Sequence, residues 1–133
     1  MTSKPRFIQH IGTHFDERPL EGKARLTLTV QEMHMNGNGV VHGGALFTLA
    51  DTAMGAALFS TLGPDELCAT IETKIAYFKP VFEGEVVCTG EIVNRGKTVA
   101  STESSLFVGE VLVAKATGSF AIFKRKTDAG LAG

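Results

Sequence analysis

The sequence predicts an α+β fold in which a curved antiparallel β-sheet wraps around one long central helix. Only one long helical segment is present, and it is apolar nearly all round. Segments on both sides of it alternate between apolar and polar residues, as half-buried strands do. Short glycine-containing turns separate the later strands and make neighbouring strands antiparallel. The economical architecture buries the helix against the sheet, in the element order β-β-α-β-β-β-β.

The clearest strand before the helix covers residues 24–30. Its polar side chains share one face, and the apolar face carries Ala24, Leu26, Leu28 and Val30. A weaker strand is expected at about residues 12–16. Pro19 and Gly22 mark the turn between the two strands.

The helix is expected from Gly43 to Ser60, and Gly63-Pro64 ends it. At about 100° per residue, one stripe along it is small or polar and consists of Gly44, Thr48, Asp51 and Gly55. The opposite side is apolar and consists of Leu46, Leu49, Ala50, Ala53 and Ala57. We expect the sheet to cover the apolar side, and a partner subunit or a ligand to face the small stripe.

Residues 40–62 form a long apolar segment, as a membrane-spanning helix also would. Asp51 in the middle of such a span costs about 2.5–3.5 kcal/mol on insertion scales. A buried helix of a globular domain is therefore the better interpretation.

After the helix, the hydrophobic pattern has a period of two. Strands are expected at residues 69–78, 85–94, 98–108 and 111–123, with turns at Arg95-Gly96-Lys97 and Gly109-Glu110. One face of the last strand is expected to carry Leu112, Ala114, Ala116, Phe120 and Ile122. We expect residues 124–133 to fray. The chain of 133 residues is then a single domain, residues 1–133, with its core at about 12–123.

Composition narrows the class of protein. Thirteen basic and fourteen acidic residues leave a net charge of −1, so there is no basic field for nucleic acid. The two isolated thiols, Cys68 and Cys88, fit a reducing cytoplasm, and Met1–Arg6 lacks the apolar core of a secretory signal. His10 and His14 have helical metal-ligand spacing, but Gly12 lies between them and no third ligand is evident. We expect a cytoplasmic protein with no metal, nucleic-acid partner or membrane contact.

The candidate site lies where the apolar helix begins. Gly43-Gly44 leave backbone N–H groups exposed at the helix N-terminus, where developing negative charge is stabilised. Asp51, in apolar surroundings, is a carboxylate that is costly to bury without a function. Asn36 and His42 are further polar groups near the turn. Together these residues provide both halves of an acyl-transfer site, an oxyanion donor and an acid.

The pattern Asn36-x5-His42-Gly43-Gly44-x6-Asp51 resembles that of the hotdog-fold thioesterases of the phenylacetate-degradation (PaaI-like) type. The resemblance extends over roughly residues 12–123 and includes Ala69-Thr70-Ile71-Glu72, Tyr77-Phe78-Lys79-Pro80 and Asn94-Arg95-Gly96-Lys97-Thr98. It implies a hotdog fold and hydrolysis of acyl-CoA thioesters. It also implies homodimers whose sheets join edge to edge, often paired further into tetramers.

The resemblance also implies roles for individual residues. Asp51 matches the acid that activates water or attacks directly, and Gly43 matches the residue whose N–H polarises the thioester carbonyl. His42 and Asn36 match loop residues that order the site, and Thr70 matches a hydroxyl residue that helps hold water. Some related thioesterases carry Ser or Thr one helical turn after the acid. This chain has Gly55 at that position, so any hydroxyl group that assists the acid must belong to another residue.

The same residues also have purely structural interpretations. Asp51 can be a structural acid, and Asn36 can simply adopt a left-handed turn. Arg95, Gly96 and Lys97 are candidates to contact the CoA phosphates, or they form only a solvated turn. No cofactor is expected, because coenzyme A is part of the substrate.

Two other functions remain open at this point. In a hotdog hydratase or dehydratase, His42 and Asp51 handle protons at neighbouring carbons. A non-catalytic acyl-CoA-binding module is the third class, although an intact acid argues against it. The sequence does not identify the acyl group of the substrate. Six large side chains can either line an apolar pocket or belong to the core, namely Phe47, Met54, Phe59, Tyr77, Phe78 and Phe82.

Helix geometry predicts that two subunits share each site. Gly43 and Asp51 are eight residues apart, which is about 12 Å along a helix at 1.5 Å per residue. A reacting carbonyl needs both groups within about 3 Å. Two antiparallel helices across a two-fold axis satisfy this, because the Gly43 end of one lies beside the middle of the other.

Overall fold

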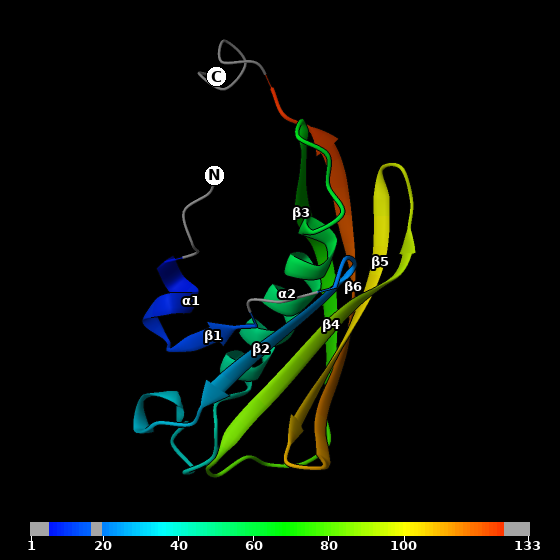
Figure 1. Cartoon of the computed structure of the whole chain (residues 1–133). Coiled ribbons are helices and arrows are strands. Elements are labelled where there is room, and N and C mark those ends of the chain that lie inside the picture. The colour runs from blue at the N-terminus through cyan, green and yellow to red at the C-terminus, as the bar shows by residue number, and fades with distance from the viewer. Residues whose placement is uncertain (1–5, 17–19, 127–133) are drawn as a thin grey trace.

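The computed structural model describes residues 6–16 and 20–126, which form one six-stranded sheet with α2 (Gly43–Phe59) against one face (Figure 1). The spatial order of the strands is β1-β2-β4-β5-β6-β3, and each neighbouring pair is antiparallel. Their bounds are β1 Thr13–Phe15, β2 Lys23–Thr29, β3 Glu66–Tyr77, β4 Glu85–Arg95, β5 Val99–Val108 and β6 Val111–Lys124. The α+β hotdog architecture predicted from the sequence is confirmed.

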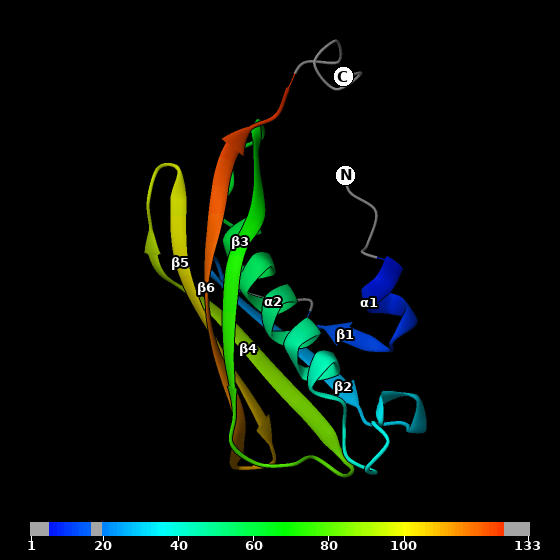
Figure 2. The same ribbon diagram turned by 180° about the vertical axis from the view of Figure 1, so that it is seen from behind.

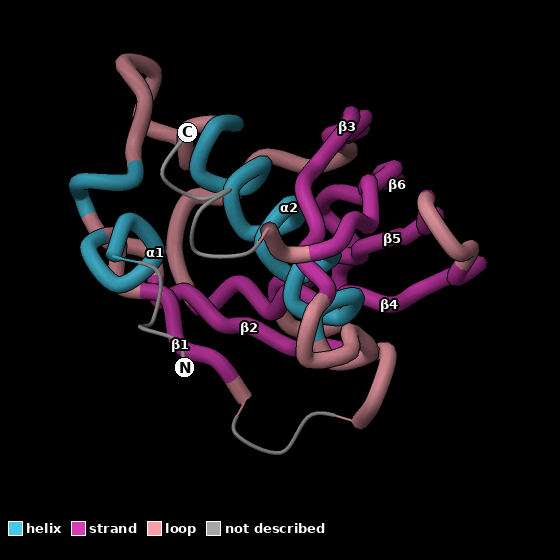
Figure 3. Tube along the Cα trace, turned by 90° about the horizontal axis from the view of Figure 1, so that it is seen from above, coloured by secondary structure: helices cyan, strands magenta, loops and turns pink. Residues whose placement is uncertain are grey.

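The core lies between α2 and the concave face of the sheet, which curves around the helix (Figure 3). All five residues of the predicted apolar side of α2 are buried. On the small stripe, Gly44 is exposed while Thr48, Asp51 and Gly55 are half-buried. The predicted covered side of the helix is therefore confirmed, whereas the partner or ligand expected at the small stripe stays a prediction.

Helix and sheet approach each other most closely at Gly90 of β4. A Cβ atom at this position would lie 2.4 Å from the carbonyl oxygen of Ala53 on α2. Only glycine permits this backbone-to-backbone approach. The sequence pattern did not single out Gly90, because a lone glycine in an alternating strand carries no such information by itself.

Two short elements were not predicted. The helix α1 (Arg6–His10) and the 3₁₀ turn η1 (Glu32–His34) flank the first two strands. Each has fewer than two turns, so neither repeats a hydrophobic period often enough to be recognised. Strand β3 begins at Glu66, three residues before its predicted start, and β6 includes Lys124, which was expected to fray.

One predicted face is wrong in detail. Leu112 does not share the buried face of β6; Val113 and Ala114 are buried next to each other instead. The register between β5 and β6 shifts between Leu106 and Phe107, so an extra residue interrupts the alternation. A strict period of two cannot reveal a bulge.

The two edges of the sheet differ. β1 is a short edge strand, whereas β3 at the other edge has twelve residues, none of them fully buried (Figure 2). Ile71 and Tyr77 on this strand, and Phe78 just after it, are about half exposed. A long edge with exposed apolar side chains is suited to pairing with another strand.

Some predictions lie at or beyond the described residues. Pro19, in the predicted first turn, is outside them, as are residues 127–133 of the predicted tail. Gly22 adopts the left-handed conformation (φ 78°) that its predicted turn requires. Across residues 6–16 and 20–126, no helix is long and apolar enough to cross a membrane.

Candidate active site

The loop before α2 is shaped by Asn36. Its side-chain oxygen accepts hydrogen bonds from the backbone N–H groups of Asn38 (2.8 Å) and Val40 (3.2 Å). Its own backbone N–H donates to the Val40 carbonyl (2.7 Å), which closes the turn. An Asx-type turn of this kind needs a short side chain that carries an acceptor. Asn36 therefore organises the loop from within, and these bonds tie its side chain to the backbone.

His42 is the N-cap of α2. Its Nδ1 accepts the backbone N–H of Gly44 (2.7 Å), so the other ring nitrogen, Nε2, carries the proton in the neutral imidazole. The backbone N–H of His42 donates to the backbone carbonyl of His34 (2.8 Å). The buried ring of His34 is in turn hydrogen-bonded, through Nε2, to the carbonyl of Ile11 (2.7 Å). This chain of bonds fixes where the helix begins.

Gly43 is the first residue of the helix, and the ring of Tyr77 covers it. The Tyr77 hydroxyl donates to the Gly43 carbonyl (2.7 Å). The two residues lie side by side in the wall of a cavity of about 300 Å³, whose lining is Val40, Val41, Gly43, Leu46, Tyr77, Phe78, Lys79, Pro80 and Val81. The start of α2 therefore forms part of the wall of this cavity.

Asp51 faces the edge strand β3. Its Oδ1 accepts hydrogen bonds from the hydroxyls of Thr70 (2.9 Å) and Thr73 (3.3 Å). Both bonds end on the same oxygen, and no residue of the part of the chain that the structure describes hydrogen-bonds to Oδ2. Two hydroxyl donors fix the orientation of a carboxylate that still has one oxygen available for chemistry.

Sequence reasoning missed Thr73. Residues three apart on a regular strand point to opposite faces, so Thr70 and Thr73 were not expected to meet. The register of β3 shifts between Thr70 and Glu72, which brings both threonines to the helix side. The bulge supplies the second hydroxyl that the glycine at position 55 cannot. A threonine pair in this spacing carries no signal unless the bulge is known.

The structure keeps Gly43 and Asp51 of one chain apart. They are in one uninterrupted helix, which corresponds to about 12 Å at 1.5 Å per residue. Their β3 contacts are separated to the same degree, because Tyr77 and Thr73 are four strand residues or about 13 Å apart. One described chain thus brings Asn36, His42 and Gly43 together at one place, and Asp51 with Thr70 at another.

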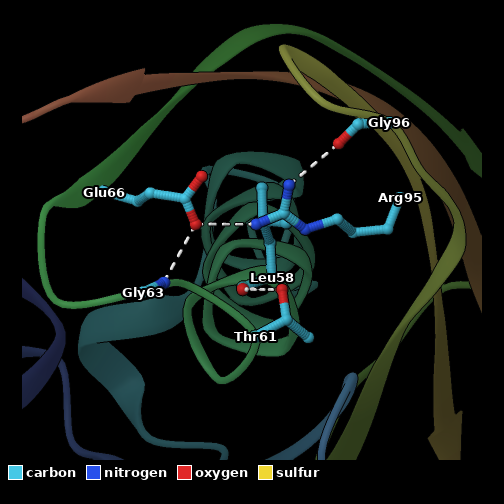
Figure 4. A network of polar contacts seen from close by, with 6 residues as sticks. All are labelled: Leu58, Thr61, Gly63, Glu66, Arg95 and Gly96. Carbon is cyan, nitrogen blue, oxygen red and sulfur yellow. Dashed lines mark hydrogen bonds and ion pairs between the residues drawn. The ribbon is translucent and has the colours of Figure 1, made fainter.

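The predicted phosphate contacts lie on the β4–β5 hairpin. Figure 4 shows that the Arg95 guanidinium is already bonded to Glu66 Oε1 and to the Gly96 carbonyl, both at 2.9 Å. Glu66 also accepts the Gly63 N–H (2.9 Å). The Gly63 N–H, and after it the Arg95 guanidinium, hold the pKa of the Glu66 carboxyl below its ordinary value. Lys97 is exposed at the tip of the same hairpin.

The six apolar candidates for a pocket divide clearly. Met54 is fully buried in the core. The remaining five are 36–57% exposed, and of these Tyr77 and Phe78 line the cavity beside Gly43. Among residues 6–16 and 20–126, no group of three or more His, Cys, Asp or Glu side chains is placed to hold a metal ion.

Residues 38–116 match the family model of the thioesterase superfamily. Acyl-coenzyme A thioesterase 13 from Pongo abelii is 33% identical to this chain over 108 residues, which cover 80% of this chain and 76% of that protein. A relative from Archaeoglobus fulgidus is 38% identical over 82 residues, which cover 61% of this chain and 51% of that protein. That second match thus spans about half of the relative's length.

Solved structures are similar over nearly the whole chain. The conserved protein PA5202 from Pseudomonas aeruginosa has a TM-score of 0.85 and 34% identity, over 90% of this chain and 95% of that one. The PaaI protein of the E. coli phenylacetic acid degradation operon has a TM-score of 0.83 and 25% identity, over 92% of this chain and 87% of that one. The chain therefore belongs to the thioesterase superfamily, and within it to the PaaI-like hotdog type of thioester hydrolase.

Proposed function

We propose that this chain hydrolyses acyl-CoA thioesters to a free acid and coenzyme A. The observation that carries the proposal is the Asp51 carboxylate, held by two threonine hydroxyls on the helix that begins with Gly43. Family membership and the relative called acyl-coenzyme A thioesterase 13 support the substrate class. No described feature favours the hydratase or the non-catalytic alternative.

The proposed chemistry follows from these groups. The thioester carbonyl accepts the Gly43 N–H, and the positive end of the helix dipole favours the developing oxyanion. One such donor is worth about 2.7–4 kcal/mol in the transition state. Asp51 takes a proton from water while the water oxygen bonds to the carbonyl carbon; the C–S bond then breaks, and the leaving sulfur takes that proton back from Asp51 and departs as the thiol of coenzyme A.

A second route is consistent with the same residues. An Asp51 carboxylate oxygen attacks the carbonyl carbon, the C–S bond breaks with departure of the CoA thiolate, and water hydrolyses the resulting mixed anhydride to the free acid and Asp51. Single turnover in ¹⁸O-labelled water separates the two routes, because only the anhydride route places the label in the Asp51 carboxylate.

We propose that each site is built from two subunits. The distance between Gly43 and Asp51 within one helix requires a second copy, and the exposed edge of β3 offers the surface for it. Pairing of two β3 edges about a two-fold axis continues the sheet from one subunit into the next. Further pairing into a dimer of dimers stays a prediction.

This pairing also decides which hairpin could reach the substrate. Arg95 contacts Glu66 at the start of β3, whereas Gly43 contacts Tyr77 at its end, eleven strand residues or about 36 Å away. A CoA molecule bound at Gly43 would therefore meet the hairpin of the partner. Because Arg95 is already paired, we propose Lys97 as the main phosphate contact, and a raised KM for CoA esters in Lys97→Ala as the readout of that contact.

The proposed reaction needs no cofactor beyond the coenzyme A of the substrate. Cys68 and Cys88 are both free thiols, which supports a reducing compartment, and we propose a cytoplasmic location.

Replacement of Asp51 tests the proposed function. Asp51→Asn keeps the oxygen that accepts from Thr70 and Thr73 but cannot take a proton or attack. We expect at least a ~100-fold fall in kcat with an unchanged fold, measured by thiol release from a panel of acyl-CoA esters. Asp65→Asn, which changes an exposed carboxylate in the loop before β3, is the control and should keep full activity. Wild-type turnover by Asp51→Asn would refute the assignment.

A further inference from the structure

The glycine pair at the start of α2 combines close contacts with a backbone that is intrinsically free to move. A Cβ atom at Gly43 would lie 3.2 Å from both the ring carbon Cζ and the hydroxyl oxygen of Tyr77, and one at Gly44 would lie 2.9 Å from His42 Nδ1. Both positions are therefore close approaches that favour glycine. Glycine also gives the backbone its greatest freedom. An oxyanion donor has to be held in place before the reaction to be effective.

Two side chains remove that freedom. The peptide unit between Gly43 and Gly44 is bonded at both of its polar groups. Its carbonyl accepts from the Tyr77 hydroxyl, and its N–H donates to His42 Nδ1, each at 2.7 Å. The N–H of Gly43 belongs to the preceding peptide unit. Because Gly43 is the first residue of α2, this N–H has no hydrogen-bond partner within the helix.

We propose that Tyr77 is a positioning residue that, together with His42, locks this peptide unit and leaves the Gly43 N–H as the only free donor of the glycine pair. The Gly44 N–H is occupied by His42 and takes no part in binding the oxyanion. This inference rests on the proposed thioester hydrolysis, which it deepens by naming the residues that select the donor. Tyr77 acts through the Gly43 carbonyl and does not itself contact the reacting atoms.

The environment of Tyr77 suits this task. Partial burial raises the pKa of its hydroxyl above the ordinary value, so the group stays protonated and able to donate at neutral pH. Tyr77 is the last residue of β3, the strand that also carries Thr70 and Thr73. The middle of this strand thus orients the acid, and its last residue orients the proposed oxyanion donor.

Tyr77→Phe tests the proposal, because it removes the hydroxyl and keeps the ring over Gly43. A lost hydrogen bond of about 0.5–1.5 kcal/mol corresponds to a fall in kcat of about two- to twelve-fold. KM should not change, since the donor acts mainly on the oxyanion. The matched control is Thr61→Val, which removes a hydroxyl bond to the Leu58 carbonyl (2.8 Å) near the other end of α2 and should leave kcat unchanged.

Amide hydrogen exchange gives a readout that does not depend on the substrate. In Tyr77→Phe, the Gly44 N–H should exchange several-fold faster, while the Ser60 N–H, bonded to Ala56 at the far end of the helix, should not change. Unchanged exchange at Gly44 would overturn the lock, and faster exchange with an unchanged kcat would overturn its catalytic role. If the wild type released no thiol from any ester, the proposed function would fail, and the exchange experiment would still decide whether the lock exists.

Discussion

At the scale of single residues, hydrogen bonds hold the polar side chains of the proposed site in place. Asn36 and His42 bond the loop backbone, Thr70 and Thr73 bond Asp51, and Tyr77 bonds Gly43. The sequence singled out Asn36, His42, Gly43 and Asp51 as candidates because they stand in one motif, and the resemblance added Thr70. It could not assign Thr73, which depends on a bulge, or the bond from Tyr77, which depends on how β3 passes the helix.

Arg95 is the residue for which the structure adds a second role to the sequence prediction. Its bond to Glu66 joins the β4–β5 hairpin to the start of β3. We expect Arg95→Ala to lower the melting temperature at pH 7 by no more than a few degrees, because partly exposed ion pairs contribute little. Lys97→Ala, on the same hairpin, should leave the melting temperature unchanged.

The pH dependence of this difference follows from Glu66. Its pKa is lowered in the folded protein, so the stabilisation is fully present above the ordinary value of 4.5 and is lost as the pH falls through the lowered pKa. The gap between wild type and Arg95→Ala, measured by thermal melts from pH 7 to pH 3, should therefore close at the acidic end. A gap that stays constant over this range would contradict the role of the pair.

At the scale of elements, the long helix and the five longer strands were predictable because each repeats its hydrophobic period several times. The short elements α1 and η1 do not, and the bulges in β3, β4 and β6 break the period. The bulge in β3 has the largest effect on the site, since it turns a second threonine toward Asp51. Strand boundaries and bulges depend on tertiary pairing, which a single strand's pattern does not contain.

The seating of α2 on the sheet depends on Gly90. We expect Gly90→Ala to destabilise the fold by at least about 1–3 kcal/mol, the usual cost of overpacking, because the added methyl meets the rigid backbone of Ala53. Urea denaturation measures the change. Gly37→Ala provides the comparison: no atom lies within 4 Å of the Cβ it would add, so its stability should stay close to wild type. Equal midpoints for the two variants would contradict the close approach.

At the scale of the whole molecule, the proposed site residues of one chain lie in two separate places. The proposed oxyanion donor is at the Gly43 end of the helix, and the proposed acid is in its middle. The twelve-residue edge of β3, with its exposed Ile71, lies along the side that a second copy would have to approach. The hotdog fold was predictable from the sequence, whereas the pairing of two chains comes from the resemblance and from the helix geometry.

Subunit complementation tests the shared site most directly. Asp51→Asn supplies an intact loop, and the double variant Asn36→Ala with His42→Ala supplies an intact acid. Each protein alone should be nearly inactive. After the two are unfolded and refolded together in equal amounts, half of the dimers are mixed, and each mixed dimer has one intact site.

The account predicts that thiol release from acyl-CoA returns to roughly a quarter of the wild-type rate, as two-fold symmetry requires. Exchange of subunits is verified by native mass spectrometry of the mixture. If mixed dimers are present and no activity returns, Gly43 and Asp51 of different subunits do not form one site, and the central claim is wrong.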